Sequence, residues 1–186
     1  MNRKIVLIRF SSRDNGNCAA IAEFLTNYHC EDAVQNFKVD NAVVAPCGNC
    51  NYECLNPALK CPNVTEDQRK IMDAVCMADL VYFLVPNYCG FPPASYYAYN
   101  EKSVGYFNLN RELMGKYRAV SKKFIIISNT EGASFKEAIR SQVMAEAEMI
   151  YLKTGKYKKQ STAGDLMTSE EAKADLIVFL ETDSFE

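Results

Sequence analysis

KIVLIRFSSRDNGNCAAIAEFL, residues 4–25, is the stretch that decides the fold. Residues 5–8 form an apolar run of the length of a buried strand, and the polar residues 11–17 follow it. Apolar side chains then recur with helical spacing at Cys18, Ile21, Ala22 and Leu25. The stretch therefore predicts a strand, a tight loop and a helix.

The loop in this stretch has the composition of an anion site. Two Ser hydroxyls, two Asn amides and one Arg gather where the helix would direct its free N–H groups and the positive end of its dipole. The loop has neither G-x-x-x-x-G-K-[ST] nor G-x-G-x-x-G, so we expect a single terminal phosphate. The alternative is an ordinary connection that is rich in turn formers.

Length and charge restrict the class of protein. The chain has 186 residues, 48% of them hydrophobic, which predicts one domain, residues 1–186, with one substantial core. A net charge of -2 argues against nucleic acid as a partner. No leader-like segment and no apolar run near the roughly 20 residues of a membrane span are present, so we expect a cytoplasmic protein without a membrane partner.

Further strands and helices are predicted to alternate along the chain. Capping boxes at Thr65/Gln68, Ser134/Glu137 and Thr168/Glu171 begin three helices, the second of which extends through Val143 and Ala147 to Ile150. The predicted strands after the first are residues 37–44, 80–85, 124–127 and 158–163. The pattern indicates an α/β fold, a three-layer, doubly wound, five-stranded parallel sheet.

Ligands of such sheets bind beyond the carboxyl ends of the strands, near the switch in strand order. Three loops meet that description, at residues 11–18, 86–93 and 128–132. We expect them to form one site.

Eight cysteines in a reducing compartment favour thiol, metal or cluster chemistry over disulfides. Four lie in one loop, Cys47, Cys50, Cys54 and Cys61. An iron–sulfur cluster, zinc and free thiols are the alternatives, and the metal-free state is favoured because Pro57 and Pro62 can order the loop. The other four, Cys18, Cys30, Cys76 and Cys89, are interpreted as small buried hydrophobes.

Two further features bear on partners and metals. His29 is the only histidine and is expected at the surface end of a helix, which leaves little basis for a histidine metal site or triad. The segment after Ala94 is unusually aromatic, with rings at Tyr96, Tyr97, Tyr99, Tyr106 and Phe107. One helix face cannot bury so many rings, which predicts a homodimer or homotetramer.

Three segments together resemble the flavodoxin-like NADPH-dependent FMN reductases and their iron–sulfur flavoprotein relatives. Residues 11–18, SSRDNGNC, are similar to the phosphate loop S-P-R-x-x-G-N-[TS], with Ser12 in place of Pro and Cys18 in place of a hydroxyl residue. Residues 46–61 are similar to the cysteine loop, although the C-x2-C-x3-C-x6-C spacing has one extra residue in its second interval. Pro86-Asn87-Tyr88 is similar to the P-x-Y flavin loop.

The resemblance implies strand order 2-1-3-4-5, FMN as cofactor, NAD(P)H as co-substrate and a small-molecule or protein electron acceptor. It places the phosphate at Ser11, Arg13, Asn15, Gly16, Asn17 and Cys18. It places the ring between two groups of residues, Pro86, Asn87, Tyr88, Cys89, Gly90 and Phe91 on one side and Asn129, Thr130, Glu131 and Gly132 on the other. The flavin supplies the chemistry, so no catalytic side chain is expected. The alternatives are an iron–sulfur electron carrier and a cofactor-free interaction module on the same fold.

Overall fold

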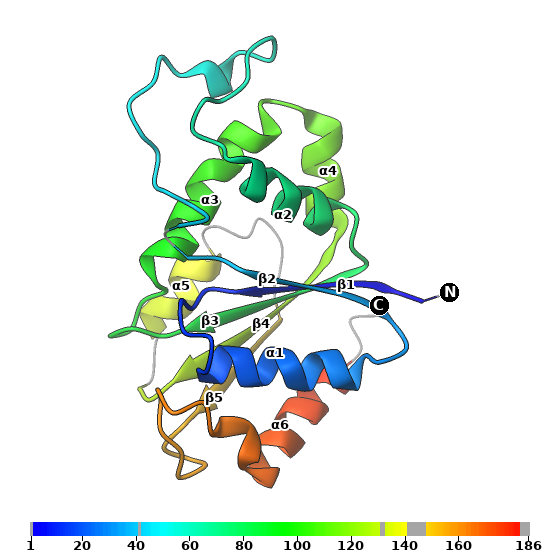
Figure 1. The fold of residues 1–186 in the computed structure, drawn as a ribbon, viewed down its shortest axis with the longest axis vertical. Helices are drawn as coiled ribbons and strands as arrows, with labels where there is room; N and C mark the ends of the chain where they lie inside the picture. The colour runs from blue at the N-terminus through cyan, green and yellow to red at the C-terminus, as the bar shows by residue number, and fades with distance from the viewer. Residues whose placement is uncertain (1, 41, 131–132, 141–147, 183–186) are drawn as a thin grey trace.

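A computed structural model describes residues 2–40, 42–130, 133–140 and 148–182 of the chain (Figure 1). The strands are β1 (Lys4–Arg9), β2 (Ala33–Lys38), β3 (Leu80–Pro86), β4 (Ser121–Ser128) and β5 (Glu148–Lys153). The helices are α1 (Asn17–Tyr28), α2 (Glu66–Cys76), α3 (Ala94–Phe107), α4 (Arg111–Ala119), α5 (Ala133–Arg140) and α6 (Glu170–Glu181), with single 3-10 turns at Glu53–Leu55 and Leu166–Thr168.

The sheet has five strands, all parallel, in the order β2-β1-β3-β4-β5, which confirms the predicted fold class and strand order. Helices α1 and α6 cover one face, and α2, α3, α4 and α5 cover the other (Figure 1). The order reverses between β1 and β3, since the chain leaves β1 toward β2 and later returns to the opposite side of β1.

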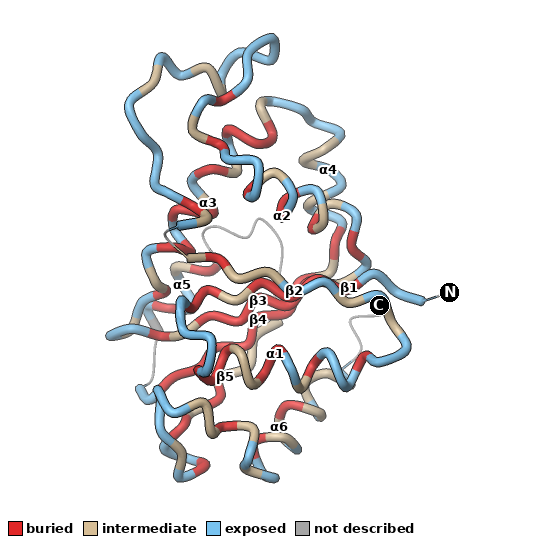
Figure 2. Tube along the Cα trace, viewed as in Figure 1, coloured by how far each residue is buried: buried red, intermediate tan, exposed pale blue. Residues whose placement is uncertain are grey.

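Alternation along the central strands divides the core into two layers. Ile5 and Leu7 of β1 pack with α1 and α6, whereas Val6 and Ile8 pack on the opposite face. The buried residues accordingly follow the middle of the sheet in Figure 2. Side chains that are apolar on both faces explain why the continuous runs of β1, β3 and β4 could be predicted as buried parallel strands.

The prediction for the second strand, residues 37–44, is wrong in its position. β2 occupies Ala33–Lys38, where Lys4 pairs with Ala33 and Arg9 with Lys38. None of its six residues is buried, so this edge strand carries no apolar run. Val39 and Val44 are fully buried, but they belong to the connection that follows the strand.

The prediction for the fifth strand is also wrong. Residues 158–163 form a loop, and Glu148–Lys153 is the strand, with Ile150 paired to Ile125 of β4. The described part of α5 ends at Arg140, while Val143 and Ala147 of the predicted helix lie outside the described residues. Helix α6 is capped by Ser169, whose Oγ accepts from the Ala172 N–H at 3.3 Å, and not by Thr168.

The aromatic residues of α3 are mostly core. Tyr96, Tyr99, Tyr106 and Phe107 are buried, and the rings of Tyr96 and Tyr99 meet Phe10 edge-on at 5.1 and 5.6 Å. Only Tyr97, 36% exposed, remains at the surface. The expectation that one helix face could not bury these rings is therefore wrong. Tyr96 and Tyr99 pack against the sheet, whereas Tyr106 bonds to α2 and Phe107 packs against α4.

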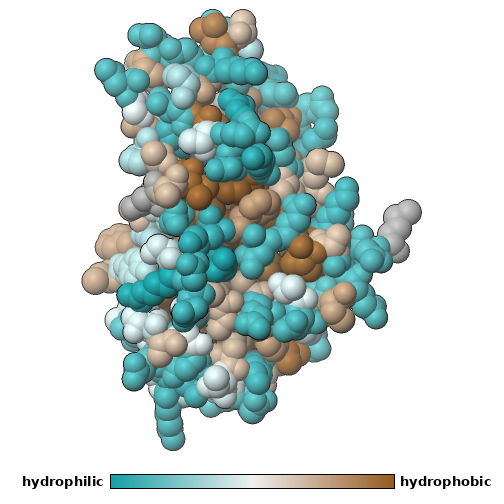
Figure 3. Space-filling view, in the orientation of Figure 1, coloured by the Kyte–Doolittle hydropathy of each residue, from teal (hydrophilic) through white to brown (hydrophobic). Residues whose placement is uncertain are grey.

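The surface in the view of Figure 1 is mainly hydrophilic, with hydrophobic side chains gathered between α2 and the sheet (Figure 3). Among the described residues, no helix has both the length and the apolar character that a membrane span requires.

Candidate functional site

A cavity of about 260 Å³ lies beyond the carboxyl ends of β1, β3 and β4, at the point where the strand order reverses. Three predicted loops contribute to it: Ser11, Arg13, Gly16, Asn17 and Cys18; Pro86, Asn87, Tyr88 and Cys89; and Asn129. Ile127, Ser161 and Thr162 complete the lining. Asn15, Gly90, Phe91 and Thr130 adjoin lining residues without lining the cavity, and Glu131 and Gly132 lie outside the described residues.

The amino end of α1 opens into this cavity. Gly16 precedes the helix with extended backbone and no side-chain cap, and its carbonyl accepts from Ala19 N and Ala20 N. The N–H groups of Asn17 and Cys18 belong to the first turn, where no intrahelical acceptor exists. Arg13 is the only charged residue among the described ones that line the cavity. A guanidinium beside a helix amino terminus suits an anion.

Asn17 uses its side chain within the protein. Its Nδ2 donates to the carbonyls of Gln160 and Ser161 at 2.9 and 3.1 Å, and its Oδ1 accepts from Leu166 N at 3.0 Å. The side chain is buried, so these bonds are shielded from water. Asn17 can therefore offer an anion its backbone N–H, while its amide joins α1 to the loop after β5.

The Cys18 thiol faces the protein interior. Its Sγ lies 3.9 Å from the Leu84 carbonyl, and burial raises the pKa of the thiol to about 12. A thiol with that pKa is neutral at physiological pH. Cys18 can therefore offer an anion its backbone N–H and not its thiol.

Asn87 shapes the loop after β3. Its Oδ1 accepts from Gly90 N at 2.8 Å, and its Nδ2 donates to Ser128 Oγ at 2.8 Å, which joins this loop to the end of β4. Tyr88 and Phe91 exchange both backbone hydrogen bonds across the turn, at 2.8 and 3.0 Å. The two residues between them have φ of 53° and 90°, a tight turn for which Gly90 is well suited.

This turn leaves two rings at the surface beside the cavity. Tyr88 is 50% exposed and lines the cavity, and Phe91 is 53% exposed. Exposed aromatic faces next to a cavity are typical of sites for planar ligands.

Sequence reasoning missed Ser161 and Thr162. Both follow β5 at the same edge of the sheet as the other three loops. The predicted strand at residues 158–163 includes both, and correct placement of β5 identifies them as loop residues with hydroxyl donors. The end of the last strand, and not the residue type, is the feature that identifies them.

Comparison with known proteins gives structural matches only. No family model matches, and no curated protein matches the sequence. The chain is similar to a Trp repressor binding protein from Bacillus subtilis, with a TM-score of 0.66 and 11% sequence identity over 97% of this chain and 100% of that one. It is also similar to an azoreductase from Bacillus anthracis, with a TM-score of 0.57 and 15% identity over 97% of this chain and 96% of that one. A third similar structure is FerB, a flavoenzyme NAD(P)H:(acceptor) oxidoreductase from Paracoccus denitrificans, with a TM-score of 0.58 and 10% identity over 96% of each chain.

The fold is flavodoxin-like. These solved structures agree with the kind of protein that the phosphate loop and the flavin loop resemble, and at this identity they establish the fold alone.

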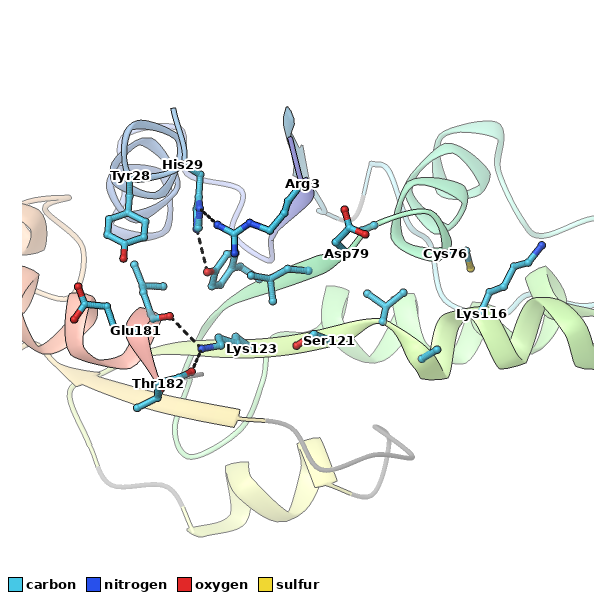
Figure 4. Close-up of a pocket in the computed structure, with 16 residues that line it drawn as sticks. Arg3, Tyr28, His29, Cys76, Asp79, Lys116, Ser121, Lys123, Glu181 and Thr182 are labelled. Carbon is cyan, nitrogen blue, oxygen red and sulfur yellow. Dashed lines mark hydrogen bonds between the residues drawn. The ribbon is translucent and has the colours of Figure 1, made fainter. Parts of the chain in front are cut away.

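A larger cavity of about 880 Å³ lies at the other end of the strands, near the amino ends of β1, β3 and β4 (Figure 4). His29 lines it with Nε2 3.1 Å from the Tyr82 hydroxyl and Nδ1 3.4 Å from Arg3 Nη2. His29 is 5% exposed, so its predicted surface position is wrong; burial, with Arg3 nearby, lowers its pKa. No predicted site residue lines this cavity, and ligands of flavodoxin-like sheets bind at the other edge.

The four loop cysteines differ in exposure. Cys61 is buried, Cys50 and Cys54 are half-buried and Cys47 is exposed. Cys61 packs so closely on α3 that a Cβ at Gly105 would lie 2.7 Å from its Sγ. Within the described residues, no group of three or more His, Cys, Asp or Glu is arranged to hold a metal ion.

The other cysteines only partly follow the sequence interpretation. Cys18 is buried as expected, whereas Cys30 and Cys89 are exposed and Cys76 is half-buried. Helix ends and the tight turn at residues 88–91 place these thiols at the surface, which composition alone did not reveal.

Proposed function

We propose that the chain is an FMN-dependent oxidoreductase that passes reducing equivalents from NAD(P)H through the flavin to a small-molecule or protein acceptor. One observation carries the proposal. Arg13 and the first-turn N–H groups of α1 meet the aromatic turn at Tyr88 in a single cavity, at the switch in strand order. This is where ligands bind in doubly wound sheets.

The residues present fit a phosphate monoester at one end of the cavity. Arg13 supplies a fixed positive charge, Asn17 and Cys18 supply N–H donors, and no carboxylate is among the described lining residues. Gly16 keeps Arg13 close, since a Cβ at Gly16 would lie 3.2 Å from Arg13 Cβ. Charge-assisted hydrogen bonds of this kind are about twice as strong as neutral ones.

The other end fits a flat ring. Tyr88 offers an exposed face, Asn87 fixes the turn that carries it, and Asn129 contributes an amide from the end of β4. FMN, when bound, supplies the group that accepts hydride from a nicotinamide and passes electrons on. The chain's own residues hold and orient the ring and keep the turn in place, and no catalytic side chain is assigned.

The cofactor released from purified protein tests the proposal. Mass spectrometry is expected to identify FMN, and the protein's visible spectrum is expected to contain flavin bands. Adenine in the extract would contradict the monoester argument, and a protein that binds no flavin at all would favour the interaction module.

Iron and sulfide analysis of protein purified without oxygen separates the electron carrier from the oxidoreductase. Metal-free protein is expected, and iron and sulfide in near-equal amounts would support the cluster alternative. An anaerobic screen of quinones, nitro compounds, ferric complexes and free flavin, each with NADH and NADPH, identifies the acceptor class and the co-substrate.

A further inference from the structure

The loop between β5 and α6 returns over the amino end of α1 (Figure 1). The Asn17 side chain is hydrogen-bonded to this loop at Gln160, Ser161 and Leu166. All three partners are backbone groups, so the position of the loop is set by its main chain. Asn17 lies 143 residues from Gln160 in sequence, which makes this a tertiary contact and not a local turn.

A second contact fixes the same loop to the phosphate loop. Gly164 has φ of +72°, and a Cβ there would lie 2.2 Å from the Asn15 carbonyl oxygen. No other residue type fits this position without moving one of the two loops. The main chain of the loop after β5 therefore rests directly on the segment that leads into α1.

The loop is also braced internally and against β4. Thr154 N donates to the Ser128 carbonyl at 2.8 Å, and Thr154 Oγ1 lies 3.3 Å from Ser161 Oγ. Gln160 N donates to Asp165 Oδ1 at 3.3 Å. Ser161 and Thr162, in the loop that these bonds brace, line the cavity together with Arg13 and Gly16.

We propose that residues 160–166 form the specificity element of the anion site. In this proposal, which rests on the proposed function, Ser161 and Thr162 donate hydrogen bonds to the terminal phosphate. The contact between Gly164 and Asn15 closes the site beyond that phosphate. Asn17 is the positioning residue that keeps the loop docked.

The physical reason is the demand of a phosphate monoester for donors. Its terminal oxygens can accept bonds from Arg13, from two N–H groups and from two hydroxyls, whereas a ligand without phosphate leaves these donors without that acceptor. The exclusion of a pyrophosphate rests on the contact between the Gly164 and Asn15 main chains, which is the closure proposed above. The site therefore selects FMN over riboflavin by hydrogen bonding and over FAD by exclusion.

Binding of FMN, riboflavin and FAD to apoprotein, followed by flavin fluorescence, tests this inference. Ser161→Ala/Thr162→Val removes both hydroxyls and keeps the volume of the side chains nearly constant. The double variant is expected to bind FMN at least about tenfold more weakly than wild type, while riboflavin affinity stays within about twofold. The change in the FMN-to-riboflavin ratio is a readout that a general loss of stability would not produce.

Gly164→Ala tests the closure, and Gly155→Ala is its matched control. Gly155 lies in the same connection, and a Cβ there meets nothing within 4 Å. Gly164→Ala is expected to weaken FMN binding and to reduce the preference for FMN over FAD, whereas Gly155→Ala leaves both unchanged. Asn17→Asp, which loses two donor bonds, is expected to behave as Gly164→Ala does.

The outcomes separate the two proposals. Wild-type protein that binds no flavin overturns both the proposed function and this inference. Wild-type protein that binds FMN, with a double variant that retains the full FMN-to-riboflavin preference, overturns the role of the loop alone. The double variant decides the question even if Gly164→Ala does not fold.

Discussion

Lys122 and Lys123 are neighbours on β4, and each caps the carboxyl end of a helix on a different face of the sheet. Lys122 Nζ donates to the carbonyls of Tyr117 and Val120 at the end of α4. Lys123 Nζ donates to the carbonyls of Phe179, Leu180 and Thr182 at the end of α6. Figure 4 shows Lys123 with Thr182. Successive strand residues point to opposite faces, and ammonium groups suit the negative ends of helix dipoles.

The first prediction concerns the pH dependence that Lys122 gives to stability. Burial lowers the pKa of Lys122 from 10.5 to about 8. Between these values the unfolded chain keeps the proton and the folded protein releases it, so this group makes the free energy of unfolding rise with pH across the window. Below about pH 8, Lys122 is protonated in both the folded and the unfolded state, and the free-energy cost of burying its ammonium is fully present.

Lys122→Met removes this titration and is expected to flatten the rise. Urea unfolding below, within and above the window, for wild type and variant, measures the difference. Lys70→Met, at an exposed position of α2, is the control and is expected to leave the slope unchanged. A variant whose stability changes with pH in parallel with wild type would show that Lys122 keeps an ordinary pKa.

The second prediction concerns Lys123. Its ammonium also lies 3.2 Å from Glu148, and its side chain is 4% exposed. Lys123→Met leaves three carbonyls at the carboxyl end of α6 and one carboxylate without this donor, which is expected to lower the free energy of unfolding by about 2 kcal/mol. Chemical denaturation measures the loss. Glu148→Gln, which removes the carboxylate and keeps the cap, is expected to cost less than half as much.

The interior of this fold could be predicted from the sequence, and its edges could not. LVYFLV at residues 80–85 and the run before residue 9 are apolar on both faces, which only a strand inside a covered parallel sheet explains. β2 and β5 are edge strands with at most one buried residue each, so their composition does not distinguish them from connections. The predicted strand at residues 124–127 omits Lys122 and Lys123, which β4 includes. Two lysines rarely enter a core, and the helix ends that satisfy them are tertiary contacts.

The residues of the candidate site could be predicted wherever the sequence revealed the end of the preceding strand. Three loops at strand ends were identified and do line one cavity, because parallel strands bring their carboxyl ends to one edge. Ser161 and Thr162 were missed together with β5. Asn17 lines the cavity as predicted, but its side-chain amide bonds to backbone groups from the far end of the chain, for which it is as well suited as for phosphate.

The third prediction concerns Lys102 on α3. Its side chain is 1% exposed and its ammonium interacts electrostatically with the Cys47 thiol, but it makes no hydrogen bond or ion pair to another described residue. An unpaired ammonium is costly to bury, and Met has a similar shape and helix propensity. Lys102→Met is expected to raise the free energy of unfolding by about 1 kcal/mol, measured in urea. A loss of stability instead would mean that the ammonium has a partner that the folded chain requires.

The fourth prediction concerns Asn87 and the turn that carries Tyr88. Asn87→Ala removes the bonds to Gly90 N and Ser128 Oγ, so the turn is expected to loosen and FMN affinity to fall by about tenfold. Fluorescence titration measures the affinity. Asn49→Ala, at an exposed position of the cysteine loop, serves as control. Unchanged FMN affinity in Asn87→Ala would remove this turn from the flavin site.

The last prediction is self-association, as a homodimer or homotetramer. The buried rings of α3 no longer support it, but Tyr88, Phe91 and Val104 are each at least half exposed, and Tyr97 is partly exposed. These side chains belong to α3 and to the turn just before it, and apolar groups of this kind favour an interface with a second copy.

Sedimentation equilibrium at micromolar concentration is expected to give a mass of at least twice the 21.0 kDa of the chain. Phe91→Ser/Val104→Ser is expected to shift the equilibrium toward monomer, because each substitution removes an exposed apolar side chain without touching the core. Leu55→Ser, at an exposed apolar position of the cysteine loop, is the matched control. A wild-type protein that sediments only as a monomer would contradict the prediction, and an unchanged mass for the double variant would place the interface elsewhere.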